Sequence, residues 1–147
     1  ELGGLMKIAL YSELARRHIV RMREEIMHLA IGSSVIAMRS FRNHVINSSE
    51  VHHKGMQSTK DFYSLSELRD LLFHVQEHRF TIPQLKDSLS ELDLKFCGFE
   101  ADTIVRDFKL KNTGANDPYN LDKWHTYEQE NPNTFISMYQ FWCQKIA

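Results

Sequence analysis

Residues 3–12 read Gly-Gly-Leu-Met-Lys-Ile-Ala-Leu-Tyr-Ser, and this stretch decides the predicted fold. The paired glycines predict a turn, and the residues after it are apolar apart from Lys7, which predicts a strand over residues 5–11. Near-continuous apolarity is typical of a strand covered on both faces, as in a parallel sheet. We therefore expect an α/β fold whose first strand follows the glycine turn directly.

Two further strands are expected far along the chain. Residues 95–100 (Lys-Phe-Cys-Gly-Phe-Glu) and 138–145 (Met-Tyr-Gln-Phe-Trp-Cys-Gln-Lys) are rich in aromatic and sulfur-bearing side chains, which suit strands. Thr81 and Gln84 have the spacing of a capping box, with Pro83 in the first turn, and predict a helix that ends near residue 92. The other helices expected in this half span residues 103–110 and 121–130.

The segment between the first strand and residue 60 predicts a helical insertion. Ser12 is a good N-cap for a helix over residues 13–30, whose apolar positions recur at spacings of four and three. A second helix is expected over residues 35–46. Residues 47–61 are polar and aperiodic, which indicates a loop. A capping box from Ser64 to Glu67 then predicts a helix that runs to about residue 73.

Composition bounds the partners and the compartment. The net charge is −1, and the four arginines of residues 16–25 are mixed with two glutamates, which predicts a solvated helix face rather than a nucleic-acid site. No apolar run approaches the ~20 residues that cross a bilayer, so no membrane partner is expected. Residue 1 is not Met, so we expect that the natural N-terminus lies elsewhere. Cys97 and Cys143 are expected to be buried free thiols in a reducing cytoplasm.

Two histidine-containing motifs are candidates for a metal site. His74-Val-Gln-Glu77-His78 matches the H-x-x-E-H string of inverted zinc metalloproteases, which needs a helix and a third ligand downstream. Thr81 caps the next helix, so His78 falls at or beyond a helix end, and no third-ligand helix follows. The adjacent pair His52–His53 has no partner at ligand spacing, which indicates solvated side chains. No metal site is therefore predicted, and a zinc hydrolase is kept only as an alternative.

Four stretches of the chain resemble class I S-adenosylmethionine-dependent methyltransferases, and in particular a bacterial subgroup often fused to tetratricopeptide repeats. The stretches are Gly4-Leu-Met-Lys-Ile-Ala-Leu-Tyr-Ser-Glu13, Asp61-Phe-Tyr-Ser64, Arg69-Asp-Leu-Leu-Phe-His-Val-Gln-Glu-His-Arg-Phe-Thr81 and Asn131-Pro-Asn-Thr-Phe-Ile-Ser-Met-Tyr-Gln-Phe-Trp142. The turn at Gly3 and Gly4 is similar to the family's L-x-P-G-G entry to a strand, with Leu2 in place of the proline.

The resemblance implies that residues 1–147 are the C-terminal part of one Rossmann-like methyltransferase domain, with residues 12–60 as an insertion. Strand 138–145 would then be antiparallel and central, between strands 5–11 and 95–100. The family holds S-adenosylmethionine on a glycine-rich loop and an acidic residue, both upstream of Glu1. We therefore expect no tight cofactor binding and no methylation by this chain alone. The resemblance also allows a tetratricopeptide-repeat region elsewhere in the parent protein, and the sequence leaves its presence open.

Ligands of open α/β sheets bind beyond the carboxyl ends of the parallel strands. By that rule, the residues at the end of the first strand lie at the cleft. The resemblance implies that the connection formed by residues 74–78 returns over the same edge of the sheet. Methyl transfer needs the two partners positioned, and a His or Glu can remove a proton from a hydroxyl or amine acceptor. The candidates for substrate contact or proton handling are Tyr11, Ser12, Glu13, His74, Glu77 and His78. Alternatively, Glu13 serves only its helix and His78 only a turn.

A second hypothesis is a non-enzymatic interaction module, in which the helices 13–30 and 35–46 form a docking hairpin with an exposed apolar stripe. The methyltransferase hypothesis makes a contrasting prediction. Without its upstream neighbour, the first strand has an unpaired edge, and such edges promote association. We therefore expect the isolated chain to be marginally stable, dimeric or prone to aggregate.

Overall fold

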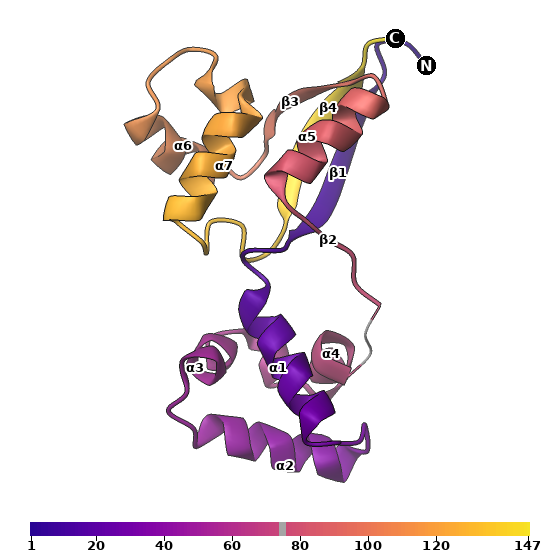
Figure 1. Cartoon of the computed structure of the whole chain (residues 1–147), viewed down its shortest axis with the longest axis vertical. Coiled ribbons are helices and arrows are strands. Elements are labelled where there is room, and N and C mark those ends of the chain that lie inside the picture. The colour runs from indigo at the N-terminus through magenta and orange to yellow at the C-terminus, as the bar shows by residue number, and fades with distance from the viewer. Residues whose placement is uncertain (74–75) are drawn as a thin grey trace. The chain divides into compact units, whose positions relative to one another are not determined.

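The computed structural model of the chain describes residues 1–73 and 76–147, and is shown in Figure 1. The chain forms two compact units. Glu1–Ala15 and His78–Ala147 make up the αβ unit, and Arg16–Glu77 make up the helical unit. The helical segment inserted after the first strand therefore continues to Glu77, beyond the boundary near residue 60 that the sequence predicted.

The αβ unit is built on a mixed four-stranded sheet with the order β2-β1-β4-β3. Strands β1 (Leu5–Ser12) and β3 (Leu94–Phe99) both run antiparallel to β4 (Tyr139–Lys145), which lies between them. Strand β2 (Arg79–Phe80) pairs in parallel with the end of β1. The α/β class and the central, antiparallel position of β4 are confirmed. The two-residue β2 was not predicted, because so short a strand has no periodic pattern.

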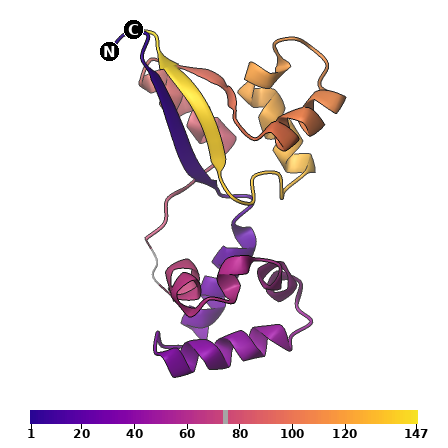
Figure 2. The ribbon, with the colours of Figure 1, turned by 180° about the vertical axis from the view of Figure 1, so that it is seen from behind.

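The β1–β4 ladder extends past the start of β1, to Gly3 and Gly4. Ile8 lies opposite Phe141, and the backbone N–H of Gly3 donates to the carbonyl of Lys145 at 2.8 Å. The positive φ of Gly3 (79°) makes the turn that the paired glycines predicted. Both chain ends therefore lie together at one corner of the αβ unit, as Figures 1 and 2 show.

One face of the sheet is covered by the helices of the αβ unit, whose buried side chains form a single core with it. Figure 2 shows the other face of β1 and β4, which no helix of this unit covers. Leu5, Lys7 and Ala9 are exposed on β1, and Trp142 is exposed on β4, whereas Ile8 packs against the core. The prediction that the first strand is covered on both faces is wrong for the described residues, because alternate side chains of β1 meet solvent.

The αβ core is strongly aromatic. The rings of Phe108 and Trp124 stack with centroids 3.7 Å apart, and the indole N–H of Trp124 donates to the carbonyl of Pro118 at 2.9 Å. The predicted Thr81–Gln84 capping box starts α5 and is confirmed. The helices of the unit are α5 (Ile82–Glu91), α6 (Asp102–Lys111), the short η3 (Asp117–Tyr119) and α7 (Leu121–Glu130). Both cysteines are free thiols; the prediction that they are buried is confirmed for Cys143 and wrong for Cys97, which is half-buried.

The helical unit has its own apolar core. Its elements are α1 (Arg17–His28), α2 (Val35–Ile46), α3 (Val51–Gln57), η1 (Lys60–Phe62), α4 (Leu65–Leu68) and the π-helical turn η2 (Arg69–Phe73). The buried apolar residues of α1 and α2 lie on the stripes that the spacing predicted, and they pack with Met56, Phe62 and Leu72. The prediction is wrong for Leu29 and Val35, which continue those stripes but are exposed. Among the described residues, no helix has the length and apolarity to cross a bilayer.

Three local predictions in this unit are wrong. Helix α1 begins at Arg17 rather than residue 13, so Ser12 is not its N-cap. Residues 47–61 contain α3 and the start of η1 instead of an irregular loop, because buried Met56 within this polar segment and Phe62 directly after it pack in the core. Ser64 accepts no capping hydrogen bond, since its hydroxyl contacts that of Ser66.

Candidate functional site

A buried carboxylate lies at the carboxyl end of β1. The Ser12 hydroxyl donates to Glu128 Oε1 at 2.6 Å, and the Tyr139 hydroxyl lies 2.8 and 2.9 Å from the two oxygens of the same carboxylate. None of the three residues is more than 1% exposed. Because β4 runs antiparallel to β1, the first residue of β4 lies beside the last residues of β1. This buried triad, Ser12–Glu128–Tyr139, thus marks the end of the sheet where α/β proteins bind ligands.

The position of Glu128 follows from the pattern of α7. Asn120 caps the helix, accepting hydrogen bonds from the backbone N–H groups of its first turn. Leu121, Trp124 and Glu128 then share one buried face, at spacings of three and four residues. A carboxylate on an otherwise apolar stripe needs polar partners inside the protein. This pattern is the signal that would have identified Glu128 from the sequence, and our prediction missed it.

Burial raises the pKa of Glu128, and hydrogen bonds from Ser12 and Tyr139 and the nearby charge of His125 oppose that rise. Burial also raises the pKa of the Tyr139 phenol. His125 lies one turn earlier on α7 and is half-buried, and its Nδ1 is buried without a hydrogen-bond partner in the described part of the chain. The triad therefore holds a carboxyl group that takes up a proton more readily than an exposed glutamate.

Three of the predicted site residues lie in the two segments that meet where β1 pairs with β2. Tyr11 is half-buried, and Glu13 and His78 are exposed. Tyr11 pairs with Arg79 of β2, and the backbone N–H of Glu13 donates to the Phe80 carbonyl at 2.9 Å. The described end of the connection thus returns to the edge of β1, as expected, and His78 directly precedes Arg79, which pairs with Tyr11 near the carboxyl end of β1.

Ser12 has a different role from the one predicted. Its side chain is fully buried, and its hydroxyl donates to Glu128 and accepts from the backbone N–H of Ala15 at 3.1 Å. Both contacts are internal, so Ser12 orients the buried carboxylate and closes the turn after β1. The sequence predicts a substrate contact for Ser12, but the structure places this side chain beneath the surface.

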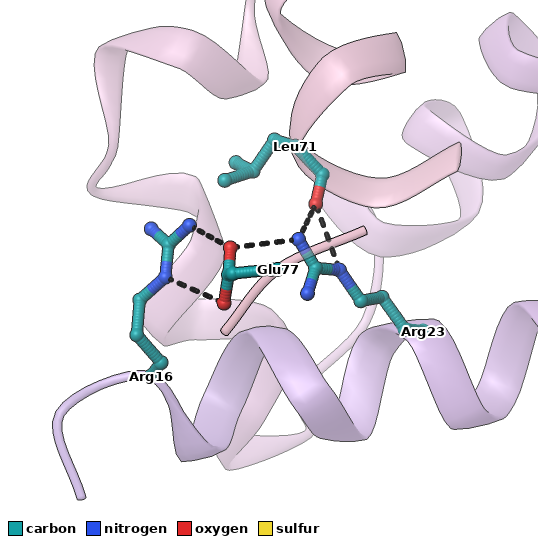
Figure 3. A network of polar contacts seen from close by, with 4 residues as sticks. All are labelled: Arg16, Arg23, Leu71 and Glu77. Carbon is teal, nitrogen blue, oxygen red and sulfur yellow. Dashed lines mark hydrogen bonds and ion pairs between the residues drawn. The ribbon is translucent and has the colours of Figure 1, made fainter. Parts of the chain in front are cut away.

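Glu77 belongs to the helical unit, where its carboxylate forms ion pairs with two arginines (Figure 3). Its carboxylate contacts Arg16 at 2.5 Å and Arg23 at 3.0 Å, and Arg23 also donates twice to the Leu71 carbonyl. Burial alone would raise the pKa of Glu77, but the bonds from both guanidinium groups hold that pKa below its ordinary value. The predicted solvated arginine face is therefore wrong for Arg16 and Arg23, whose side chains are only 10% exposed.

The described residues of the H-x-x-E-H motif do not form the helical zinc site of a hydrolase. His74 lies outside the described residues, and Glu77 and His78 are in a non-helical segment. The H-x-x-E-H chemistry requires both histidines on one helical face, which this segment does not offer at His78. Neither a scan against protein-family models nor a search of curated proteins gave a match for this chain. The functional argument therefore depends on the geometry of the site.

Proposed function

We propose that the chain is the C-terminal part of an S-adenosylmethionine-dependent methyltransferase and that it forms the acceptor-substrate side of the cleft. The observation that carries the proposal is the order of the sheet. An antiparallel β4 lies between two strands, β1 and β3, that are parallel to each other. The methyltransferase resemblance of the sequence implied this arrangement, although the first strand lies more than 80 residues from the other two.

The exposed side of β1 supports the same proposal. On the side away from β4, β1 pairs only through Tyr11 and Ser12, so Leu5 to Leu10 form no ladder there among the described residues. Leu5 is 64% exposed and Met6 46% exposed. An open strand edge with apolar side chains fits a sheet that continues into further strands. In the proposed enzyme, the upstream part of the domain pairs with this edge.

The chain's own residues divide into two groups at the carboxyl end of β1. Tyr11, Glu13 and His78 are accessible and can contact an acceptor. Ser12 and Glu128 are buried and, with Tyr139, join β1, α7 and β4 by hydrogen bonds at this point. In the proposed reaction Glu13 or His78 removes a proton from a hydroxyl or amine acceptor, and the buried triad keeps the end of β1 in place.

The residues present do not fit the cofactor. A glycine-rich loop for S-adenosylmethionine would follow a strand and open a helix, as in other nucleotide-binding turns. Gly3 and Gly4 instead precede β1, and Gly98 lies within β3, where its φ is 112°. We therefore assign no cofactor contact to this chain. The proposal requires the cofactor-binding residues to lie upstream of Glu1.

The upstream coding sequence tests the proposal most directly. The proposal predicts a strand followed by a glycine-rich loop and, about twenty residues later, an acidic residue. The polypeptide that includes this region should bind S-adenosylmethionine in calorimetric titrations, and residues 1–147 alone should not. Tight binding by residues 1–147, or upstream sequence without the loop, would contradict the proposed division of the domain.

Variants of the longer polypeptide test the proposed roles. Glu13→Gln and His78→Asn are compared with Glu91→Gln and His28→Asn, which change exposed residues that are not candidates for this site. Loss of the base should lower kcat by roughly 100-fold and leave cofactor affinity unchanged. Equal activity of all four variants would remove Glu13 and His78 from the mechanism. Acceptor classes are screened by transfer of a labelled methyl group.

The interaction module remains the alternative proposal. Its docking stripe was expected on helices 13–30 and 35–46, but the apolar stripe of α1 and α2 is buried in the core of the helical unit. Other apolar side chains are exposed near the α1–α2 turn, including Met27 and Ile36. Met27→Lys and Ile36→Lys would abolish partner binding if this surface docks a protein, and would leave methyl transfer unchanged.

A further inference from the structure

Two helices of the helical unit, α2 and α3, bring imidazole groups to one carboxylate on α1. Glu25 is on α1, His44 is on α2, and His52 and His53 are on α3. A carboxylate oxygen of Glu25, a ring nitrogen of His44 and a ring nitrogen of His53 all lie within 4.8 Å of one another. The residues come from different parts of the sequence, so only the packing of α1, α2 and α3 makes this cluster visible.

The contacts within the cluster are short and partly shielded from water. His53 Nε2 lies 2.7 Å from Glu25 Oε2, His52 Nε2 lies 3.2 Å from the same oxygen, and His44 Nε2 lies 3.5 Å from Oε1. His53 is 2% exposed, whereas His44 is 59% exposed. The sequence had indicated solvated side chains for His52 and His53, and that prediction is wrong because α3 turns both toward α1.

We propose that Glu25, His44 and His53 bind a divalent transition-metal ion of the zinc type. Imidazole nitrogen and carboxylate oxygen are preferred zinc donors, with bonds of about 2.0–2.2 Å. Tetrahedral bonds of that length separate neighbouring donor atoms by roughly 3.3 Å, so the present spacing needs only small side-chain movements. Three protein donors leave a fourth position for water or another ligand.

His52 supplies the partner that such sites need outside the metal bonds. Its contact with the Glu25 carboxylate would hold that ligand in orientation, as outer partners do in zinc proteins. His44 opens the cluster to solvent and gives the ion a route of entry. His53 Nδ1 is buried and has no hydrogen-bond partner among the residues that the structure describes. Hydrogen bonds within the protein therefore leave this buried ring incompletely satisfied.

A cluster held only by hydrogen bonds is the competing explanation. In that case the N–H groups of the rings are shared by one carboxylate, and the group serves only to join α1, α2 and α3. The two explanations differ in one respect, because a metal site releases protons when the ion binds and becomes more stable as the ion concentration rises. Zinc ions alone can therefore distinguish them.

The experiment uses residues 1–147, stripped of metal by a chelator and then titrated with zinc chloride in a calorimeter. We expect one ion per chain, and a higher melting temperature with zinc. Cobalt(II) should give the visible absorption of a four-coordinate site. His44→Ala should weaken zinc binding by at least roughly tenfold, and His52→Ala by roughly tenfold. His44 is exposed, so its variant should fold normally.

The matched control is His28→Ala, which removes another exposed histidine of the helical unit outside the cluster. Its affinity for zinc should equal that of the unchanged chain. Absence of binding, binding unaffected by His44→Ala, or equal losses in His44→Ala and His28→Ala would each overturn the proposal. None of these measurements depends on methyl transfer, so the proposal of a metal site and the proposal of methyltransferase activity are tested independently.

Discussion

Each of the two units holds a glutamate whose side chain is shielded from water, and the surroundings shift the pKa values of the two carboxyl groups in opposite directions. Glu77 in the helical unit faces two guanidinium groups, and its pKa is lowered. Glu128 in the αβ unit faces two hydroxyl groups, and its pKa is raised by burial. Burial opposes ionisation in both units. The difference shows that a full positive charge outweighs desolvation, whereas neutral donors such as Ser12 and Tyr139 do not.

The largest expected effect is in the helical unit. Glu77→Ala leaves Arg16 and Arg23 buried without their carboxylate, and loss of one member of a buried ion pair costs roughly 3 kcal/mol. Urea unfolding followed by far-ultraviolet circular dichroism measures the change in the free energy of unfolding. The control Glu67→Ala changes an exposed glutamate of α4 and should stay within about 0.5 kcal/mol. Equal stabilities of the two variants would show that the arginines find other partners.

The corresponding change in the αβ unit should be smaller. Glu128→Ala leaves the hydroxyls of Ser12 and Tyr139 without their acceptor, which costs about 2 kcal/mol, whereas Glu128→Gln keeps one acceptor oxygen and should cost less than about 1 kcal/mol. Both tryptophans, Trp124 and Trp142, belong to the αβ unit, so their fluorescence reports its unfolding. A Glu128→Gln loss as large as that of Glu128→Ala would mean that the negative charge itself is needed.

Ser12→Ala should have a still smaller effect. It removes one donor to Glu128 and the acceptor for the Ala15 N–H, while Tyr139 continues to bind the carboxylate, so we expect a loss of about 1 kcal/mol. Ser88→Ala, at an exposed position of α5, is the matched control. No loss in Ser12→Ala would indicate that Tyr139 alone orients Glu128.

The pH dependence of stability should differ in sign between the two glutamates. The lowered pKa of Glu77 gives stability that is present above the unfolded pKa near 4.5 and is lost as the pH falls through the folded pKa. The raised pKa of Glu128 gives stability that is present below that unfolded pKa and is lost as the pH rises through the folded pKa.

The variants separate these two contributions. The stability deficit of Glu77→Gln relative to the unchanged chain should grow as the pH rises through the acidic range, since only the unchanged chain gains from ionisation. The deficit of Glu128→Gln should shrink over the same rise. Urea titrations at a series of pH values measure both. Parallel trends in the two variants would show that the guanidinium and hydroxyl partners do not set the difference.

The sheet could be predicted from sequence because its strands are long apolar or aromatic runs. The resemblance also supplied their order, with residues 138–145 in the middle. Helix α7 was predicted from Leu121 to Glu130 as observed. The two-residue β2 and the π-helical turn of residues 69–73 were missed, because neither has a local pattern separate from its neighbours.

The candidate sites were less accessible to prediction because their partners are distant in sequence. Ser12 and Glu128 are 116 residues apart, and Arg16 and Glu77 are 61 residues apart. Reading α1 alone, a row of arginines indicates a solvated face, and nothing local reveals the buried carboxylate that pairs with two of them. The same reason hid the cluster at Glu25, since its histidines come from α2 and α3.

The ladder that joins Gly3 to Lys145 has a consequence for the order in which the chain can be connected. Within residues 1–147, Gly3 and Lys145 are hydrogen-bonded neighbours, so a short linker could join the ends of this stretch without disturbing the sheet. New ends could then be opened in the polar stretch of residues 112–116 between α6 and η3. In such a circular permutant β4 and β1 would form a hairpin, and a contact that now spans the whole sequence would become local. Its folding should therefore be faster, because lower contact order shortens the search for native contacts.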